Sequence, residues 1–219
     1  MTVYVITVIW SIMPKPFTDP ERERIATRLI LAGKRLLNQG GVKRLTVEEV
    51  SKEAGIAKGS FYAFFPSKED LILSIFESWE DEYRGSLMRL VTEGEGSPRE
   101  RLERFFRGAF SLLEREPALA SLGSGELERI VERLPPERIA AHAARDGEEL
   151  GARTRRWIEA GILAPVEPET LEGAMLSLFF LALHRGDFPG GRFEAAAGLL
   201  SEALALRLAA PGGAEGRAR

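Results

Sequence analysis

The chain has 219 residues, of which 44% are hydrophobic and 29% are charged, and this balance is typical of a globular protein rather than a disordered one. It contains no cysteine, which excludes disulfide bonds and thiolate metal sites and agrees with a location in the reducing cytoplasm. The formal net charge is only −3, and the uneven distribution of charge along the chain matters more than this total.

The first 13 residues are apolar and carry no charge. This run is too short to cross a bilayer, and it lacks the basic start of a signal peptide, so we expect no membrane partner. For residues 1–17 we favour a misassigned start, with the true beginning near Met13. A flexible arm that becomes ordered against a partner or DNA is the alternative.

The first predicted helix begins at Thr18, where a capping side chain and Asp19 precede a proline at position 20. Its apolar residues recur at helical spacing, namely Ile25, Leu29, Ala32 and Leu36. Gly40 and Gly41 predict its end, because glycine readily ends a helix.

The pattern of residues 46–66 is that of two short helices joined by a tight turn. Thr46 and Glu49 have the spacing of a capping box at the start of the first helix, and Gly55 suits a left-handed turn after it. The second helix is expected over residues 58–64 and must end before Pro66. Two short helices joined in this way form a helix-turn-helix, whose second helix enters the DNA major groove.

The second of these helices opens with Lys58, Gly59 and Ser60. Residues of its first turn face the groove, so a cation and a hydroxyl there can reach base edges or phosphates, and glycine allows a close approach of the backbone. A solvated helix start is the alternative. Residues 14–70 hold 11 Lys and Arg against 8 Asp and Glu, and this small basic surplus agrees with DNA binding without establishing it.

The rest of the chain is also predicted to be helical, with no strand and no internal repeat. Helices are expected over residues 67–91, from 97 to an interruption near Pro117, and over 126–133, 139–160, 167–185 and 193–208, before a disordered tail at 211–219. The fold class is therefore all-α, with about nine helices. Because residues 167–185 are apolar nearly all round and the last helix is rich in Ala and Leu, we expect a homodimer interface of four helices that includes Leu178.

The run from Thr46 to Leu71 reads Thr-Val-x-x-Val-x-x-x-Ala-Gly-Ile-x-Lys-Gly-Ser-Phe-Tyr-x-Phe-Phe-x-Ser-Lys-Glu-Asp-Leu. It resembles the tetracycline-repressor (TetR) family of bacterial transcriptional regulators, over roughly residues 20–75. The resemblance implies a helix-turn-helix DNA-binding domain at residues 18–66 and a helical ligand-binding and dimerisation domain at 67–210. It also implies that Thr46, Tyr62 and Lys68 bind DNA phosphates. Thr46 has a second, structural role as a helix cap.

The chain departs from the common family pattern at Ala63, where His, Tyr or Asn is frequent, and at Phe64, where Tyr is frequent. Alanine can make only an apolar contact, such as one with a thymine methyl group, and phenylalanine lacks a phosphate-binding hydroxyl. These departures leave DNA binding in place but prevent the transfer of sequence specificity from relatives. Phe61 and Phe65 are expected to be core residues rather than base-stacking groups.

The body contains bulky apolar residues that are candidates for lining a small-molecule pocket: Phe105, Phe110, Trp157, Met175 and Phe179. Ordinary core packing is the alternative for each of them. The pattern indicates a small apolar or amphipathic effector, and it predicts no cofactor and no metal site, since the two histidines, His142 and His184, are not at helical spacing.

We therefore expect a ligand-responsive homodimeric repressor that binds a palindromic double-stranded DNA operator. The alternative is a helical small-molecule-binding or interaction protein that no longer binds DNA. We do not expect an enzyme, because the sequence contains no nucleophile elbow, metal-binding histidine pair or Gly-rich phosphate loop.

Overall fold

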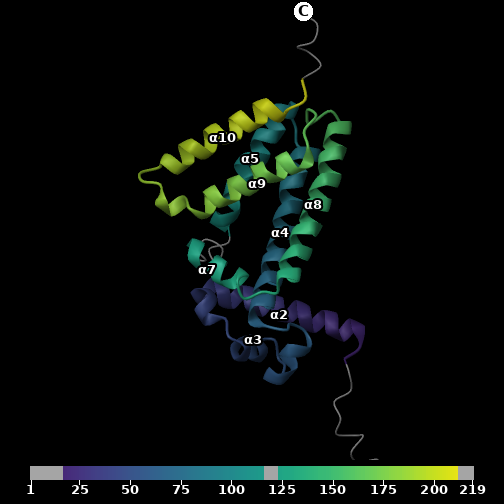
Figure 1. Cartoon of the computed structure of the whole chain (residues 1–219), viewed down its shortest axis with the longest axis vertical. Coiled ribbons are helices and arrows are strands. Elements are labelled where there is room, and N and C mark those ends of the chain that lie inside the picture. Colours follow the sequence, from purple (N-terminus) through teal and green to yellow (C-terminus); the bar gives the residue numbers. More distant parts are fainter. Residues whose placement is uncertain (1–16, 116–122, 212–219) are drawn as a thin grey trace, which may run out of the picture.

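The computed structural model describes residues 17–115 and 123–211, and these form an elongated all-α molecule (Figure 1). A small unit of α2 (Asp19–Arg44), α3 (Val47–Glu53) and the 3₁₀ helix η1 (Lys58–Ala63) lies at one end. The long helix α4 (Lys68–Thr92) leads from this unit to the helices at the other end. The predicted arm at 1–17, apart from Phe17, and the predicted tail, apart from Pro211, lie outside the described residues.

The N-terminal end of α2 confirms the predicted start. The carboxylate of Glu21 accepts a hydrogen bond from the backbone nitrogen of Thr18 at 2.9 Å, which satisfies an otherwise free group of the first turn. Near its other end the helix breaks at Gly40 and Gly41, where Gly41 has a φ of 65°, as expected, but a short helical continuation reaches Arg44 beyond the break.

The predicted helix-turn-helix is present, with one difference in its second helix. Gly55 follows α3 with a φ of 70°, a conformation that favours glycine. The expected α-helix over residues 58–64 is a 3₁₀ helix, η1. Its shortness has a physical reason, because the chain must leave the helical conformation before Pro66, and six residues permit little α-helical hydrogen bonding.

Two aromatic residues of this segment hold the unit together from inside. Phe61 is fully buried and Phe65 nearly so, with ring centroids 5.9 Å apart, which confirms that they are core residues. Burying a phenylalanine side chain contributes about 1.5–3 kcal/mol. The two rings therefore fix η1 against the rest of the unit and leave its opposite side outward.

The body is a bundle built around α4 and α5 (Pro98–Arg115), with α7 (Gly123–Val131), α8 (Pro136–Glu159), α9 (Pro168–Leu183), the 3₁₀ helix η2 (Arg185–Asp187) and α10 (Arg192–Leu208). Helix α5 packs against α4, α9 and α10, and α8 packs against α9. The predicted interruption near Pro117 falls outside the described residues. No described helix has the length and apolarity that a membrane span requires.

The expectation that the body has no strand holds for the described residues, where the only β-type pairing is an isolated bridge between Leu163 and Ala209. There the backbone nitrogen of Ala164 donates to Leu208 at 2.8 Å, and that of Ala210 donates to Ile162 at 2.9 Å. These bonds tie the end of α10 to the loop that follows α8.

Candidate nucleic-acid interface and apolar body

The first turn of η1 places three predicted DNA-binding residues on the surface of the molecule. Lys58 and Gly59 are exposed and Ser60 is half-buried, and a Cβ atom added at Gly59 would meet no atom within 4 Å. Tyr62, one turn further, is 56% exposed, although its ring edge rests on Phe61 with centroids 5.3 Å apart. The structure therefore brings these four residues together on one short element.

Lys58 has a partner that sequence reasoning missed. Its ammonium lies 3.4 Å from the Oε2 atom of Glu48 on α3, and both side chains are mostly exposed. An ion pair this exposed contributes little to stability, about 0–1 kcal/mol. The ammonium of Lys58 is therefore free to exchange Glu48 for a phosphate or base edge at small cost.

The other two predicted residues, Thr46 and Lys68, stand at the starts of α3 and α4. The hydroxyl of Thr46 accepts a hydrogen bond from the backbone nitrogen of Glu49 at 3.1 Å, and that of Ser67 accepts one from Asp70 at 3.0 Å. A capping box has two hydrogen bonds, and only the one from the Glu49 backbone to the Thr46 hydroxyl is present among the described contacts. The second, from the Thr46 backbone to the Glu49 carboxylate, is not. Helix N-termini attract anions through their free N–H groups and dipole, and so suit phosphates.

Arg22 is a residue of the interface region that sequence reasoning did not single out. It donates to the carbonyl oxygen of Ala63 at 2.7 Å, and its guanidinium lies 5.4 Å from the ring centroid of Phe64. Phe64, one of the two departures from the family pattern, thus packs with Arg22 and with Phe17. No signal in the sequence links Arg22 to residues more than 40 positions away.

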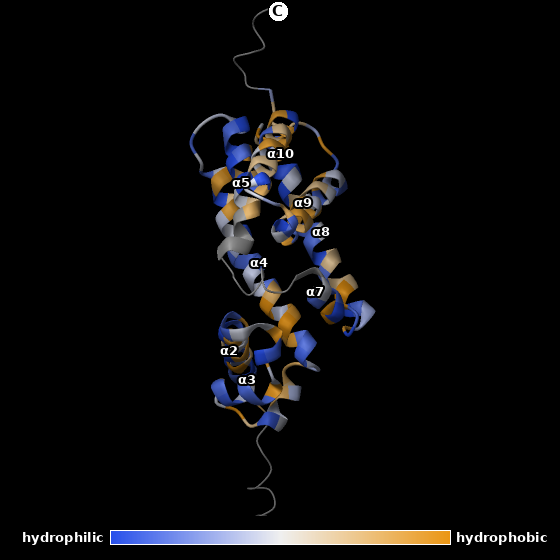
Figure 2. Ribbon diagram, turned by 90° about the vertical axis from the view of Figure 1, so that its left-hand side faces the viewer, coloured by the Kyte–Doolittle hydropathy of each residue, from blue (hydrophilic) through white to orange (hydrophobic). Residues whose placement is uncertain are grey.

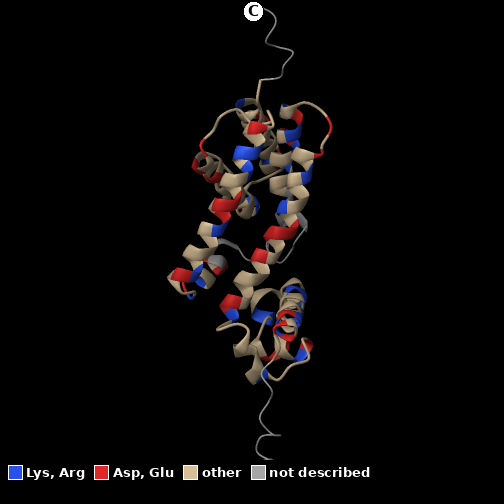
Figure 3. Cartoon of the chain, turned by 90° about the vertical axis from the view of Figure 1, so that its right-hand side faces the viewer, with Lys and Arg blue, Asp and Glu red and all other residues tan. Residues whose placement is uncertain are grey.

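Basic and acidic residues alternate along the helices of this unit (Figure 3). The basic surplus counted over residues 14–70 therefore does not form a uniformly positive face. Binding of the DNA backbone to this unit would therefore depend on individual cations at helix starts, such as Lys58 and Lys68, rather than on a positive potential over the whole unit.

The five predicted pocket residues are brought together only in part. Phe105 on α5 and Trp157 on α8 are buried and meet edge to face, with centroids 5.4 Å apart. Phe110 pairs instead with Phe193 on α10, at 5.6 Å. Two half-buried residues of α9, Met175 and Phe179, complete the set, and Phe179 contacts Phe180.

Phe193 was missed as a member of this aromatic group. It also meets Phe188 at 5.7 Å and lies under the guanidinium of Arg185. The sequence did place Phe193 at the start of the last predicted helix, and a bulky aromatic residue at that position could have been counted among the candidates. The Phe105–Trp157 and Phe110–Phe193 contacts thus join different helices edge to face, as aromatic residues do in a packed interior. A ligand would have to separate them to open a cavity.

Helices α9 and α10 expose large apolar side chains that no part of the described chain covers. On α9 these are Leu176 and Phe180, the latter 49% exposed, and on α10 they are Leu199, Leu200 and Leu206. Figure 2 shows hydrophobic stretches along both helices. Large exposed apolar residues such as these are typical of a contact surface in a folded protein.

The prediction that placed Leu178 in this exposed surface was wrong. Leu178 is only 4% exposed, because it lies on the side of α9 that packs into the bundle. A helix that is apolar all round gives no periodicity from which to tell its inner side from its outer side.

Comparison with known proteins gives a family match over the helix-turn-helix. The family model described as "Bacterial regulatory proteins, tetR family" matches residues 29–75. The chain is 37% identical over 79 residues to an uncharacterised HTH-type transcriptional regulator, YuxN, of Bacillus subtilis, covering 36% of this chain and 26% of that protein. It is 33% identical over 79 residues to the HTH-type transcriptional repressor NemR of Escherichia coli K12, covering 36% and 40%.

The similarity to these curated relatives thus spans less than half of their length. Similarity of fold extends further. A crystal structure of a TetR-family regulator from Rhodococcus sp. aligns with a TM-score of 0.58 at 20% identity, over 85% of this chain and all of that one. The helical body therefore has the fold of such regulators, although its side chains differ.

Proposed function

Because this chain belongs to the tetR family of bacterial regulatory proteins, we propose that it is a cytoplasmic, ligand-responsive transcriptional repressor. In this proposal a homodimer binds a palindromic operator in double-stranded DNA and is released by a small apolar or amphipathic effector. The observation that carries the proposal is the exposed first turn of η1, held outward by the buried Phe61 and Phe65.

The DNA contacts divide into two kinds. Lys58, Gly59 and Ser60 are placed to approach base edges as η1 enters the major groove, where lysine pairs with guanine acceptors. Thr46 and Lys68 bind phosphates from the two flanking helix starts, and Tyr62 adds a third phosphate contact through its hydroxyl. Base contacts carry specificity, and phosphate contacts fix the register of the protein on the duplex.

The exposed apolar residues of α9 and α10 support dimerisation. In a dimer with a two-fold axis, α9 and α10 of one chain pack against α9 and α10 of the other. This packing covers Leu176, Phe180, Leu199 and Leu206 in each copy. A two-fold dimer presents two η1 helices in inverted orientation, and such a pair matches a palindrome.

Effector binding is assigned to the aromatic residues between α5, α8 and α9. Phe105, Trp157 and Phe179 offer apolar surface, and ring pairs at edge-to-face distance can separate to admit a flat or flexible ligand. An effector that separates them displaces α5, which packs directly on α4, the helix that leads to the DNA-binding unit. Membrane partners and cofactors have no part in this proposal.

The proposal is tested by fluorescence anisotropy with labelled duplex from upstream of the protein's own gene, across a range of salt concentrations. We expect Lys68→Ala to weaken binding to operator and unrelated DNA alike, and to reduce the slope of log K against log salt by about one. Lys58→Ala should also reduce discrimination between operator and altered operator, by roughly 1–3 kcal/mol.

Arg156→Ala is the matched control, since it removes one exposed positive charge from α8, far along the chain from the interface. It should leave binding unchanged. An equal loss on both DNAs for Lys58→Ala would make Lys58 a phosphate contact. Failure of the native protein to bind any duplex would reject the proposal in favour of a helical binding protein that does not contact DNA.

A further inference from the structure

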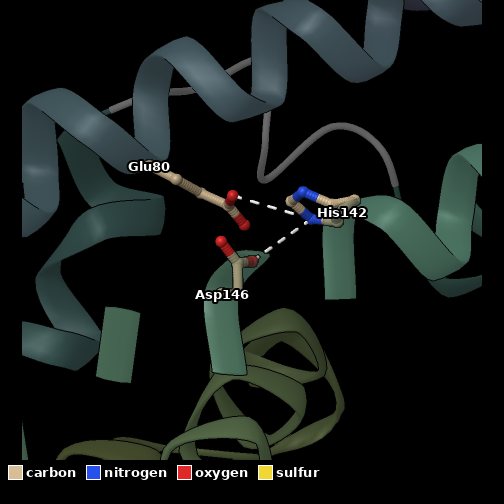
Figure 4. A group of neighbouring side chains, drawn as sticks. All are labelled: Glu80, His142 and Asp146. Atoms are coloured by element: carbon tan, nitrogen blue, oxygen red, sulfur yellow. Dashed lines mark ion pairs between the residues drawn. The ribbon is translucent and has the colours of Figure 1, made fainter. Parts of the chain in front are cut away.

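A cluster of titratable side chains joins α4 and α8 and includes none of the proposed DNA-binding or effector-binding residues. Glu80 comes from α4, and His142 and Asp146 lie one turn apart on α8 (Figure 4). One ligand-type atom from each of the three residues lies within 4.8 Å of the other two. The two helices run side by side, so the cluster spans the junction between the helix leaving the DNA-binding unit and the body (Figure 1).

The distances within the cluster fit a tetrahedral metal ion. The Nε2 atom of His142 lies 3.7 Å from Oε2 of Glu80 and 3.4 Å from Oδ2 of Asp146. Ligand bonds of about 2.1 Å at a tetrahedral centre place ligand atoms about 3.4 Å apart. Small side-chain rotations would therefore allow all three atoms to bind one ion, with a water molecule in the fourth position.

A third carboxylate, that of Glu77, orients the imidazole from its other side. The Nδ1 atom of His142 lies 3.4 Å from Oε1 of Glu77, which Arg138 holds with two hydrogen bonds of 2.9 and 2.7 Å. Burial works against ionisation of Glu77, but the hydrogen bonds from His142 and Arg138 prevail and lower its pKa to about 2. A carboxylate that accepts the Nδ1 proton leaves Nε2 with its lone pair toward Glu80 and Asp146, as in carboxylate–histidine–metal arrangements.

Glu80 provides an independent sign that a ligand belongs here. The Glu80 side chain is 37% exposed, but its Oε2 atom is buried and accepts no hydrogen bond, and the nearest cations to that atom are His142 at 3.7 Å and Arg84 at 3.8 Å. Burial, reinforced by the charge of Asp146, raises the pKa of Glu80. A buried carboxylate oxygen without a donor is costly, and direct coordination of a cation would remove that cost.

Arginines surround the cluster, and one of them, Arg84, lies 3.8 Å from Oε2 of Glu80, so an ion would share this oxygen with its guanidinium. Arg84 donates to Oδ1 of Asp146 at 3.0 Å and to Glu149 at 2.8 Å, so the other oxygen of Asp146, Oδ2, is the one that faces His142. Arg145 contacts Oε1 of Glu77 and Nδ1 of His142, each at 3.4 Å, and lies 4.0 Å from Oδ1 of Asp146, so it does not reach the Nε2 and Oδ2 atoms proposed as ligands. The guanidinium groups therefore hold the carboxylates in place and balance part of their charge.

We propose that Glu80, His142 and Asp146 bind one divalent transition-metal ion, with Glu77 as the residue that positions His142. One imidazole nitrogen and two carboxylate oxygens favour Zn²⁺ or a similar ion over Mg²⁺ and Ca²⁺, which prefer all-oxygen sites. The bound ion fastens α4 to α8. The rival occupant is a proton on Nε2 of His142, which would hold the same two carboxylates as an ion pair.

Titration of the untagged, metal-stripped full chain with Co²⁺ tests the proposal, since tetrahedral Co²⁺ absorbs visible light. We expect saturation at one ion per chain and displacement by Zn²⁺. His142→Ala and Glu80→Gln should each weaken binding at least 100-fold, and Glu77→Gln by roughly 10–100-fold, as loss of an orienting partner does. His184→Ala removes the other histidine and should have no effect.

A thermal scan distinguishes the metal from the proton. Zn²⁺ should raise the Tm of the native chain and of His184→Ala but not that of His142→Ala, because a bound ligand stabilises only the state that binds it. Circular dichroism at room temperature verifies that each variant is folded. Absence of visible Co²⁺ absorption, or equal Co²⁺ affinity in the native chain and His142→Ala, would overturn the metal site and leave the ion pair.

Discussion

Two glycines of the helix-turn-helix occupy very different environments. Gly55 has a φ of 70°, which is in the left-handed region, whereas the φ of Gly59 is not positive. A Cβ atom added to Gly59 would meet no atom within 4 Å. The first glycine is thus required by the backbone of the turn. The second is required by nothing in the protein, which leaves close approach to a partner as the reason for its presence.

These two positions give a matched pair of substitutions. Gly55→Ala should lower the free energy of unfolding by about 1–2 kcal/mol, because alanine is strained in the left-handed region. Gly59→Ala should leave the Tm unchanged or raise it slightly, since alanine is the better helix former, yet weaken operator binding. Thermal unfolding and anisotropy measure both effects. Full operator affinity in a well-folded Gly59→Ala would show that the backbone of η1 does not approach DNA.

The role of a single residue can be predicted from the sequence where that residue acts on its neighbours in the chain. Thr46, Gly55 and Pro66 have roles that depend on a few adjacent residues, and the structure confirms the cap, the turn and the end of η1. Arg22 and Glu48 were missed because their partners, Ala63 and Lys58, become neighbours only when the chain folds.

Helices α9 and α10 are the elements on which the proposed dimer depends. Each has buried residues on one side and large exposed apolar residues on the other, so a single chain leaves the apolar outer side of both helices uncovered. The sequence predicted both helices and their apolar character. It did not predict which side is outward, since that depends on the packing of α5, α8 and α9.

The exposed side predicts a clear difference between two neighbouring positions. Phe180→Glu should give a folded monomer, because the new charge would be buried without a partner only in the dimer. Leu178→Glu should instead destabilise the protomer itself, since position 178 is inside the bundle. Light scattering with thermal unfolding distinguishes the two, and Gln39→Glu, an exposed change on α2, is the control. A dimeric Phe180→Glu would place the interface elsewhere.

The helical plan itself follows from local signals. Caps, prolines and glycines gave helix ends within a few residues for α2, α4 and α8, because those signals are local to the chain. The 3₁₀ form of η1 and the Glu80–His142–Asp146 cluster were not predicted. The cluster joins positions 80 and 142, and no spacing rule relates residues on two helices that have α5 and α7 between them in the chain.

In the whole molecule, α4 is the mechanical link between the DNA-binding unit and the body. Lys34 of α2 pairs with Glu82 at 2.9 Å, the Tyr83 hydroxyl donates to the carbonyl of Gly108 on α5, and Arg84 reaches Asp146 on α8. Three consecutive residues of α4 therefore contact three different helices. A displacement of α4 would reach η1 through α2 and α3, which pack between them.

This arrangement predicts reciprocal coupling. If an effector among Phe105, Trp157 and Phe179 tilts α4 and separates the two η1 helices, operator DNA must weaken effector binding by the same factor by which the effector weakens operator binding. Calorimetric titration of the identified effector, with and without saturating operator, measures the factor. Equal effector affinity in both titrations would mean that the protein binds DNA without this switch.

The central claim is that a dimer reads DNA through two η1 helices, and selection of tightly bound duplexes from a random pool tests it most directly. We predict enrichment of an inverted repeat whose half-sites are about one helical turn, or a multiple of it, apart. The same selection with Lys58→Ala should give relaxed preference at symmetric positions in both half-sites. No enriched sequence, or a single asymmetric site, would contradict the account.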